Sequence, residues 1–263
     1  MQASKDREPK DRLAVALDFP SAEAALALVD RLDGSCRWFK VGMELYYAAG
    51  NSLIETLRKR GFHIFLDLKL HDIPNTVAGA VRSVTSAGAG LLTVHAGGGT
   101  AMLSAAVEAA NVPGGATLLA VTVLTSIDAA ELAGVGITAT PAQHVLRLAK
   151  LAQGAGIHGM VCSAEEVELL RDELGHELGH AEGGGPLLVV PGIRPAGSAH
   201  GDQKRVATAT EAIARGASML VVGRPITQAS DPATAARSIL AEIQAASHTG
   251  ALKHRLQKKA DKD

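Results

Sequence analysis

Four charged side chains in two short segments could act together on one substrate. The segment FLDLKLHDIPNT holds Asp67 and Lys69 two residues apart, with Asp72 three residues further on, and WFKVG holds Lys40. Residues two apart in an extended strand point to the same face, so Asp67 and Lys69 share one face, and the alternating leucines at 66, 68 and 70 take the other. Asp72 lies beyond the strand, just before the turn at Pro74, so strand alternation does not fix its direction.

Two lysines and two aspartates at this spacing form an alternating, nearly neutral charge array. Neighbouring carboxylates favour the ammonium form of a lysine. A protonated lysine can donate a proton or stabilise negative charge, whereas a Schiff-base lysine must be neutral. The array therefore favours proton donation. The alternative is a structural salt-bridge network, although buried ion pairs contribute little to stability by themselves.

Two segments near the C-terminus have the composition of an anion site. PGIRPAGSAHGDQKR is a glycine-rich stretch with Arg194 and Gln203, and VVGRPI offers the amide of Gly223 and the guanidinium of Arg224. The arginine fork matches phosphate oxygens. These segments predict a site for a phosphorylated substrate.

Short apolar runs rich in β-forming residues must position these side chains. Eight of them occur, at residues 13–19, 38–45, 63–70, 91–96, 117–125, 157–163, 187–193 and 219–226. Alanine-rich stretches with helical spacing separate them, for example residues 21–32, 142–153 and 206–215. Eight such units most simply close into a single-domain α/β fold, the (β/α)8 or TIM barrel, and the alternative is an open doubly wound sheet.

The barrel is expected to span residues 12–246. Residues 1–11 are expected to be a disordered N-terminal tail and residues 247–263 a charged C-terminal tail. The longest spacing follows Thr125, where SIDAAELAGVGITATPAQ is expected to be a mobile loop at the functional end of the barrel. In RDELGHELGHAEGGG a helix is expected to run out into glycines, and His176 and His180 are interpreted as residues of its solvent-facing surface rather than metal ligands.

Barrel chemistry belongs at the C-terminal ends of the strands, and polar residues close nearly every predicted strand. They are Asp18, Lys40, Asp67 with Lys69, His95, Thr125 with Ser126, Ser163, Arg194 and Arg224. So many polar groups at one mouth are difficult to explain by stability, so an active site is predicted there. His95 could serve in packing or in substrate contact.

Composition excludes several classes of function. The 263 residues are 47% hydrophobic and carry a formal net charge of -1, which argues against nucleic acid or an anionic membrane as partner. Two cysteines cannot form a disulfide framework, and no carboxylate–histidine cluster indicates a metal site. The N-terminus is polar, and no apolar run approaches the roughly 18 residues of a membrane span, so a cytoplasmic protein is expected.

The motifs ALDF, FKVG, DLKLHDIPNTV, VTVLTS, PGIR, GDQKR and VVGRPI occur in an order that closely resembles the orotidine 5'-phosphate decarboxylases of the common bacterial type. The similarity covers about residues 12 to 246, and DLKLHDIPNT is its most specific part. The resemblance implies a homodimer of (β/α)8 barrels that converts orotidine 5'-monophosphate to UMP and carbon dioxide, without metal or cofactor, in pyrimidine biosynthesis.

The resemblance also implies roles for the charged residues. Lys69 is expected to donate the proton to C6 of the pyrimidine, and Asp67 to lie against the substrate carboxylate. Lys40 is expected to hold Asp67 and a ribose hydroxyl, and Asp18 to bind the ribose.

Further contacts follow from the same resemblance. The expected contributions to the neighbouring subunit's site are Asp72, Ile73 and Thr76. The expected base contacts are Thr125 and Ser126, with Gln203 bridging base and phosphate. The expected phosphate contacts are Arg194, Gly223 and Arg224.

Two rival functions remain at this point. One is a metal-dependent sugar-phosphate decarboxylase or aldolase of the same superfamily, similar to 3-keto-L-gulonate 6-phosphate decarboxylase or hexulose 6-phosphate synthase. The other is a non-catalytic nucleotide-binding barrel. The HDIPNT, LTS and GDQ segments suit a pyrimidine, and a sensor has no need of a proton donor at Lys69.

Overall fold

The apolar runs form eight parallel strands that close into one barrel in chain order, from β1 to β8 and back to β1. The computed structural model describes residues 8–175, 185–195 and 205–260, without the side chains of 248–260. The strands are β1 (Leu13–Leu17), β2 (Trp38–Gly42), β3 (His63–Leu70), β4 (Leu91–His95), β5 (Thr117–Val121), β6 (Gly159–Val161), β7 (Leu187–Val190) and β8 (Met219–Val222). The predicted (β/α)8 barrel is confirmed, and the open sheet is excluded.

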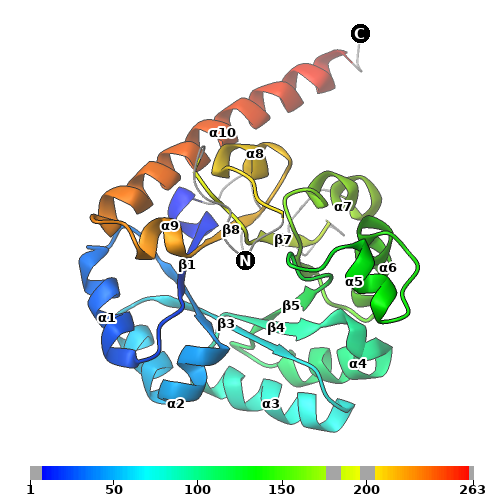
Figure 1. Cartoon of the computed structure of the whole chain (residues 1–263), viewed down its shortest axis with the longest axis horizontal. Coiled ribbons are helices and arrows are strands. Elements are labelled where there is room, and N and C mark those ends of the chain that lie inside the picture. The colour runs from blue at the N-terminus through cyan, green and yellow to red at the C-terminus, as the bar shows by residue number, and fades with distance from the viewer. Residues whose placement is uncertain (1–7, 176–184, 196–204, 261–263) are drawn as a thin grey trace.

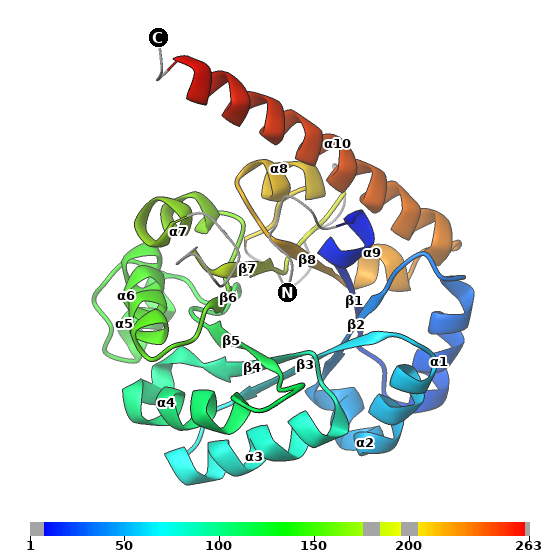
Figure 2. The same ribbon diagram turned by 180° about the vertical axis from the view of Figure 1, so that it is seen from behind.

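Helices surround the barrel on all sides (Figures 1 and 2). The α-helices are α1 (Ala22–Arg31), α2 (Met43–Lys59), α3 (Pro74–Ala87), α4 (Gly99–Ala110), α5 (Ala129–Gly134), α6 (Pro141–Gly154), α7 (Val167–Leu174), α8 (Ala209–Ala214), α9 (Arg224–Thr227) and α10 (Pro232–Ala260). The described residues also form two short 3-10 helices, η2 (Pro9–Arg12) and η3 (Ala96–Gly98). Among the described residues, no helix is long and apolar enough to cross a bilayer.

Strand alternation divides the apolar side chains into two cores. The outward-facing side chains of the strands pack against the helices in one large cluster. The inward-facing side chains fill the barrel, and this interior cluster comprises Ala14, Ala16, Trp38, Phe65, Leu91, Leu119, Leu187, Val189, Met219 and Val221. Trp38, the single tryptophan of the chain, is buried at the N-terminal end of β2, where its ring stacks on His63 with centroids 4.9 Å apart.

Polar residues fix where several helices begin. The hydroxyl of Ser21 accepts from the amide of Ala24 at the start of α1. Thr140 and Thr208 form reciprocal capping boxes with the third helical residue of α6 and α8. Such caps stabilise a helix by about 1 kcal/mol each, because they satisfy amides that have no partner inside the helix.

Helical structure extends beyond both expected limits of the barrel. Residues 9–11, expected in the N-terminal tail, belong to η2, and Asp11 pairs with Arg37 at 3.1 Å. Helix α10 continues through the predicted boundary at residue 247 to Ala260, and it projects past the barrel in Figure 1. Residues 1–7 and 261–263 lie outside the described residues.

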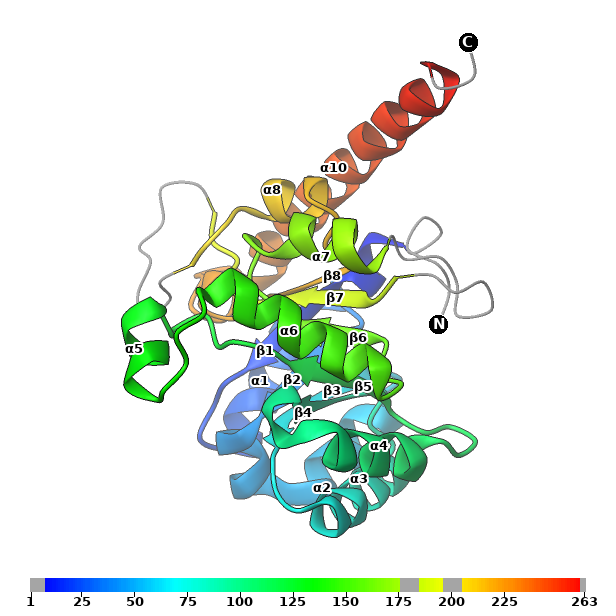
Figure 3. The same cartoon turned by 90° about the vertical axis from the view of Figure 1, so that its right-hand side faces the viewer.

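The segment after Thr125, expected to be a loop, contains α5. The carboxylate of Asp128 accepts from the amides of Ala130 and Glu131, and the side chain of Glu131 caps the amide of Asp128 in return. This capping box starts a short helix inside the segment that was expected to be a loop. Figure 3 shows α5 standing apart from the helical ring at one end of the barrel.

Most strands end earlier than predicted. Only β3 keeps both expected ends, whereas β5 and β8 stop four residues short of the predicted limits. Asp18, Thr125, Ser126 and Arg194 therefore lie in the connections that follow the strands, and Arg224 is the first residue of α9. A strand in a closed barrel ends where its chain must turn outward to the covering helix, and apolar content alone does not mark that point.

Candidate active site

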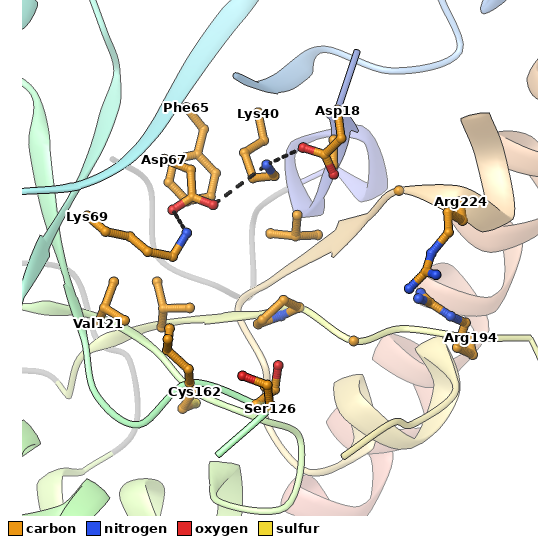
Figure 4. A pocket seen from close by; sticks show the side chains of 18 of the residues that line it. Asp18, Lys40, Phe65, Asp67, Lys69, Val121, Ser126, Cys162, Arg194 and Arg224 are labelled. Atoms are coloured by element: carbon orange, nitrogen blue, oxygen red, sulfur yellow. Dashed lines mark hydrogen bonds and ion pairs between the residues drawn. The ribbon is translucent and has the colours of Figure 1, made fainter. Parts of the chain in front are cut away.

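Lys40, Asp67, Lys69 and Asp18 form one chain of ion pairs at the mouth of the barrel (Figure 4). The Nζ atom of Lys40 lies 2.9 Å from Oδ1 of Asp18 and 3.6 Å from Oδ2 of Asp67. The Nζ atom of Lys69 donates to Oδ1 of Asp67 at 2.8 Å. The structure thus brings together four of the predicted site residues, which we call the charged wall.

Asp67 is the central anion of the charged wall. Burial by itself would raise the pKa of Asp67, but the charges of Lys40 and Lys69 and hydrogen bonds from Lys69 and Thr93 outweigh burial and lower that pKa below the usual range of aspartate. Asp67 is therefore ionised at neutral pH, as a permanent negative charge beside the Lys69 ammonium group.

The backbone at Lys69 departs from regular strand geometry. Its φ is 49°, in the left-handed region, and strands β3 and β4 lose their regular register between Leu66 and Leu70. A side chain other than glycine costs about 1–2 kcal/mol in this region. Unusual backbone held in place by its surroundings is typical of functional sites. Strand periodicity predicted the direction of Lys69 but not this bulge.

The charged wall opens into a cavity of about 560 Å³ at the C-terminal ends of the strands. That volume is in the range of small-molecule sites. Its polar lining residues are Asp18, Lys40, Asp67, Lys69, Thr125, Ser126, Arg194, Arg224 and Gln228, and Gly223 also lines it. Nine of the predicted site residues therefore line one cavity.

The opposite side of the cavity, which we call the loop wall, is built from segments that follow β5 to β8. Arg194 and Arg224 lie there with their guanidinium groups pointing toward one another, across the cavity from Lys69 (Figure 4). Val121, Val123 and Cys162 add apolar side chains to the lining of the same cavity. A cavity with charged groups at separate places and some apolar lining suits a small polar ligand that carries anionic groups.

Three predicted residues do not line the cavity. Asp72, Ile73 and Thr76 are exposed beyond the end of β3, and the carboxylate of Asp72 accepts from the amide of Ile73 at 2.6 Å. Gln203, predicted to bridge base and phosphate, lies outside the described residues, as do His176 and His180.

His95 belongs to the packing around the charged wall. It does not line the cavity, and its ring lies 5.5 Å from the ring of His71. Burial, reinforced by His71 and Lys69, lowers the pKa of His95 below its usual value. Of the two roles left open for His95, the structure supports packing.

Sequence reasoning missed a buried polar network behind the loop wall. Glu166 is 4% exposed, and its carboxylate accepts from the amide of Ser163 at 2.7 Å and pairs with Arg205. The Nη2 atom of Arg205 donates to the carbonyl of Leu124 at 2.9 Å. The GDQKR motif contained Arg205, but nothing in the local sequence indicated a partner 39 residues away.

One further residue of the cavity lining lacked a sequence signal. Gln228 follows the short helix α9 and lines the cavity, although no strand-end pattern marks it.

Within the described ranges, no three His, Cys, Asp or Glu side chains are grouped so that they could hold a metal ion.

Comparisons with known proteins give consistent matches over most of the chain. The model of a family described as "Orotidine 5'-phosphate decarboxylase / HUMPS family" matches residues 11–239. An orotidine 5'-phosphate decarboxylase of Halorhodospira halophila is 54% identical over 236 residues, which cover 89% of this chain and 97% of the relative. One from Anaeromyxobacter sp. (strain K) is 52% identical, covering 90% of this chain and 100% of the relative.

A solved structure supports the same relationship. The crystal structure of orotidine 5'-phosphate decarboxylase from Lactobacillus acidophilus superimposes with a TM-score of 0.76 at 38% identity. The match covers 90% of this chain and 99% of that one. Sequence and fold are thus similar over the whole barrel.

Proposed function

Because the chain belongs to the orotidine 5'-phosphate decarboxylase / HUMPS family, we propose that Lys69 donates the proton that replaces the carboxyl group lost from orotidine 5'-monophosphate. The reaction of the enzyme is the decarboxylation of this nucleotide to UMP and carbon dioxide, a step of pyrimidine biosynthesis. The observation that carries the assignment to Lys69 is its 2.8 Å ion pair with the partly buried Asp67 at the edge of the cavity.

The chemistry explains why a fixed ammonium group is needed. When the bond from C6 to the carboxyl carbon breaks, its electron pair stays on C6 and carbon dioxide leaves. That carbanion has little delocalisation, so its charge must be stabilised by the site. The Nζ proton of Lys69 then transfers to C6, giving UMP, and the neutral amine regains a proton from water.

Asp67 and Lys40 are proposed to prepare this step. The carboxylate of Asp67 lies against the substrate carboxyl group and holds the Lys69 ammonium, while Lys40 holds Asp67 from the other side. Lys40 also donates to Asp18, and both residues are proposed to contact ribose hydroxyls. The 8% exposure of Lys40 supports a fixed position for its ammonium group.

The loop wall is proposed to bind the rest of the nucleotide. Arg194, Arg224 and the amide of Gly223 hold the phosphate, which matches the usual phosphate site after strands seven and eight of such barrels. Thr125 and Ser126 contact the base, and Gln203 bridges base and phosphate. Binding energy from the phosphate, far from C6, can then contribute to lowering the barrier.

A homodimer with shared sites is proposed to complete the cavity. Ile73, 68% exposed, precedes α3, and two other exposed apolar side chains, Met43 at 45% and Tyr47 at 80%, lie on the adjacent α2. Large exposed apolar side chains on neighbouring elements are typical of a subunit interface. Asp72, Ile73 and Thr76 would then reach the cavity of the partner.

Subunit mixing tests the shared site. Lys69→Ala and Asp72→Ala dimers are each expected to be inactive, but a mixed dimer regains one intact site. Random exchange makes half of the dimers mixed, so activity should return to about a quarter of the wild-type value. Lack of recovery, with exchange verified by mass spectrometry, would contradict the shared site.

The first experiment is the loss of the orotate absorbance of orotidine 5'-monophosphate in the presence of excess EDTA. Conversion to a uracil spectrum would support the reaction and its independence of metal. No change with a folded sample, together with turnover of a 3-keto sugar phosphate in magnesium, would favour the rival function. The two buried, free cysteines, Cys36 and Cys162, fit our expectation of a reducing cytoplasm.

A further inference from the structure

A single residue of β4, Thr93, lies opposite the irregular part of β3. The register pairs Leu66 with Leu92 and Leu70 with Val94, so three residues of β3 lie opposite the single residue Thr93 of β4. Thr93 is fully buried. The extra residues of a bulge lose their regular ladder partners, and their amides need another acceptor.

One hydroxyl group serves both members of the central ion pair. The Oγ1 atom of Thr93 accepts from the amide of Lys69 at 2.8 Å and donates to Oδ1 of Asp67 at 3.1 Å. The same Asp67 oxygen accepts from Nζ of Lys69. A hydroxyl group offers one proton and two lone pairs, so it can do both at once.

Thr93 does not line the cavity, so it would act through its neighbours. The amide it holds belongs to Lys69 in its left-handed conformation, which directs the side chain to the cavity, and the carboxylate it holds is the partner of the Lys69 ammonium. A buried threonine with a purely structural role needs only a backbone carbonyl. Thr122 is an example, since its hydroxyl donates to the carbonyl of Val161 at 3.0 Å.

We propose that Thr93 is a positioning residue, whose hydroxyl fixes the bulge at Lys69 and the carboxylate of Asp67 in the geometry needed for proton transfer. The inference rests on the proposed function of Lys69. Strand β4 supplies no residue to the cavity lining. Through Thr93 it would nevertheless position the reacting groups that β3 carries.

The test replaces the hydroxyl by a methyl group of similar size. Thr93→Val is expected to lower kcat by roughly 100-fold with KM changed less than about threefold, because a small misplacement of a reacting group has an effect of that size. Thr93→Ser keeps the hydroxyl and should restore most of kcat. Thr122→Val is the matched control, with a kcat close to that of the wild type.

The pH profile separates positioning from a general structural role. The groups facing Asp67 are Lys40 on β2, Lys69 on β3 and His95 on β4, with Asp18 beyond Lys40. Without the Thr93 donor the ionised form of Asp67 is less favoured, so the acid limb of kcat/KM should move to higher pH in Thr93→Val. Thr93→Ser and Thr122→Val should keep the wild-type limb.

Two results would overturn the proposal. One is a Thr93→Val enzyme with unchanged kcat and acid limb, and the other is equal loss of kcat in Thr93→Val and Thr93→Ser. If Thr93→Val does not fold, Thr93→Ser and Thr93→Ala are compared instead, and equal kcat in these two would overturn the proposal.

A double variant separates this proposal from the proposed function of Lys69. Adding Thr93→Val to Lys69→Ala should cause no further loss of kcat. An active Lys69→Ala enzyme would instead contradict the donor role itself.

Discussion

The charged wall and the loop wall are held in place by different kinds of contact. In the charged wall, side chains from β2 and β3 bind one another directly, and Asp67 is the common partner. In the loop wall, Arg205 reaches backbone carbonyls of the segment after β5, and its charge is balanced by the buried Glu166. Rigid strands therefore carry the groups proposed for chemistry, and loops carry those proposed for binding.

This difference suggests a division of labour. Groups that must keep a fixed distance through the reaction gain from strands with direct side-chain contacts. Groups that must admit and release a nucleotide gain from segments that can move. If the comparison is right, changes in the charged wall should mainly affect kcat, and changes behind the loop wall should mainly affect KM and stability.

The largest effect is expected in the charged wall, from Lys69→Ala. Turnover should fall by at least about 10³-fold, because both the proton donor and the charge beside C6 are lost. Steady-state kinetics with a circular dichroism check of folding would measure it. Lys59→Ala, which removes an exposed ammonium on α2, is the control and should behave as the wild type. More than about 10% of the rate remaining would refute the donor role.

The next effect is expected behind the loop wall, from Arg205→Met. The change leaves the carboxylate of Glu166 buried without its cation, so the free energy of unfolding should fall by about 3 kcal/mol. Released from Arg205, the carbonyl of Leu124 no longer anchors the loop, so KM should rise more than kcat falls. Urea unfolding and steady-state kinetics would measure the two effects.

A second variant checks this explanation. Arg205→Met/Glu166→Gln removes the unpaired charge and should recover part of the stability. A single variant as stable as the wild type, or a double variant no better than the single one, would show that the ion pair does not hold the loop wall.

The sequence predicted the charged wall better than the loop wall, because the two walls depend on different kinds of contact. Strand alternation is a local rule, and it predicted that Asp67 and Lys69 share one face; both line the cavity, although β3 is irregular at Lys69. The bulge at Lys69 was missed, since it depends on Thr93, which is 24 residues away in sequence. The network of Arg205, Glu166 and Ser163 was missed because burial and pairing of charges arise only when distant segments pack.

A smaller effect concerns the pH dependence of stability. The pKa of Asp67 is lower in the folded than in the unfolded protein, so its ionisation stabilises the fold fully above the unfolded pKa of about 3.9. This contribution is lost as pH falls through the lower, folded value. The stability difference between the wild type and Asp67→Asn should therefore be constant from pH 5 to 7 and change below about pH 4. Unfolding curves that keep a constant difference down to pH 2 would contradict it.

The smallest effect is expected at Cys162, in the apolar part of the cavity lining. Cys162 lines the cavity, yet it is 1% exposed, and burial raises the pKa of its thiol to about 12. Cys36 is buried with a pKa raised in the same way. Ellman's reagent at pH 8 should therefore label neither thiol in the native enzyme and both in urea. Rapid native labelling that disappears in Cys162→Ser would show that this surface opens.

The position of Trp38 gives the barrel an intrinsic fluorescence probe. The chain has no other indole, and this one lies in the interior cluster, between neighbours on β1 and β3, away from the lining of the cavity. Its fluorescence should therefore report whether the barrel is closed, and should respond little to nucleotide binding. A single emission signal can thus follow unfolding of every variant described above, without an added label and without interference from substrate occupancy.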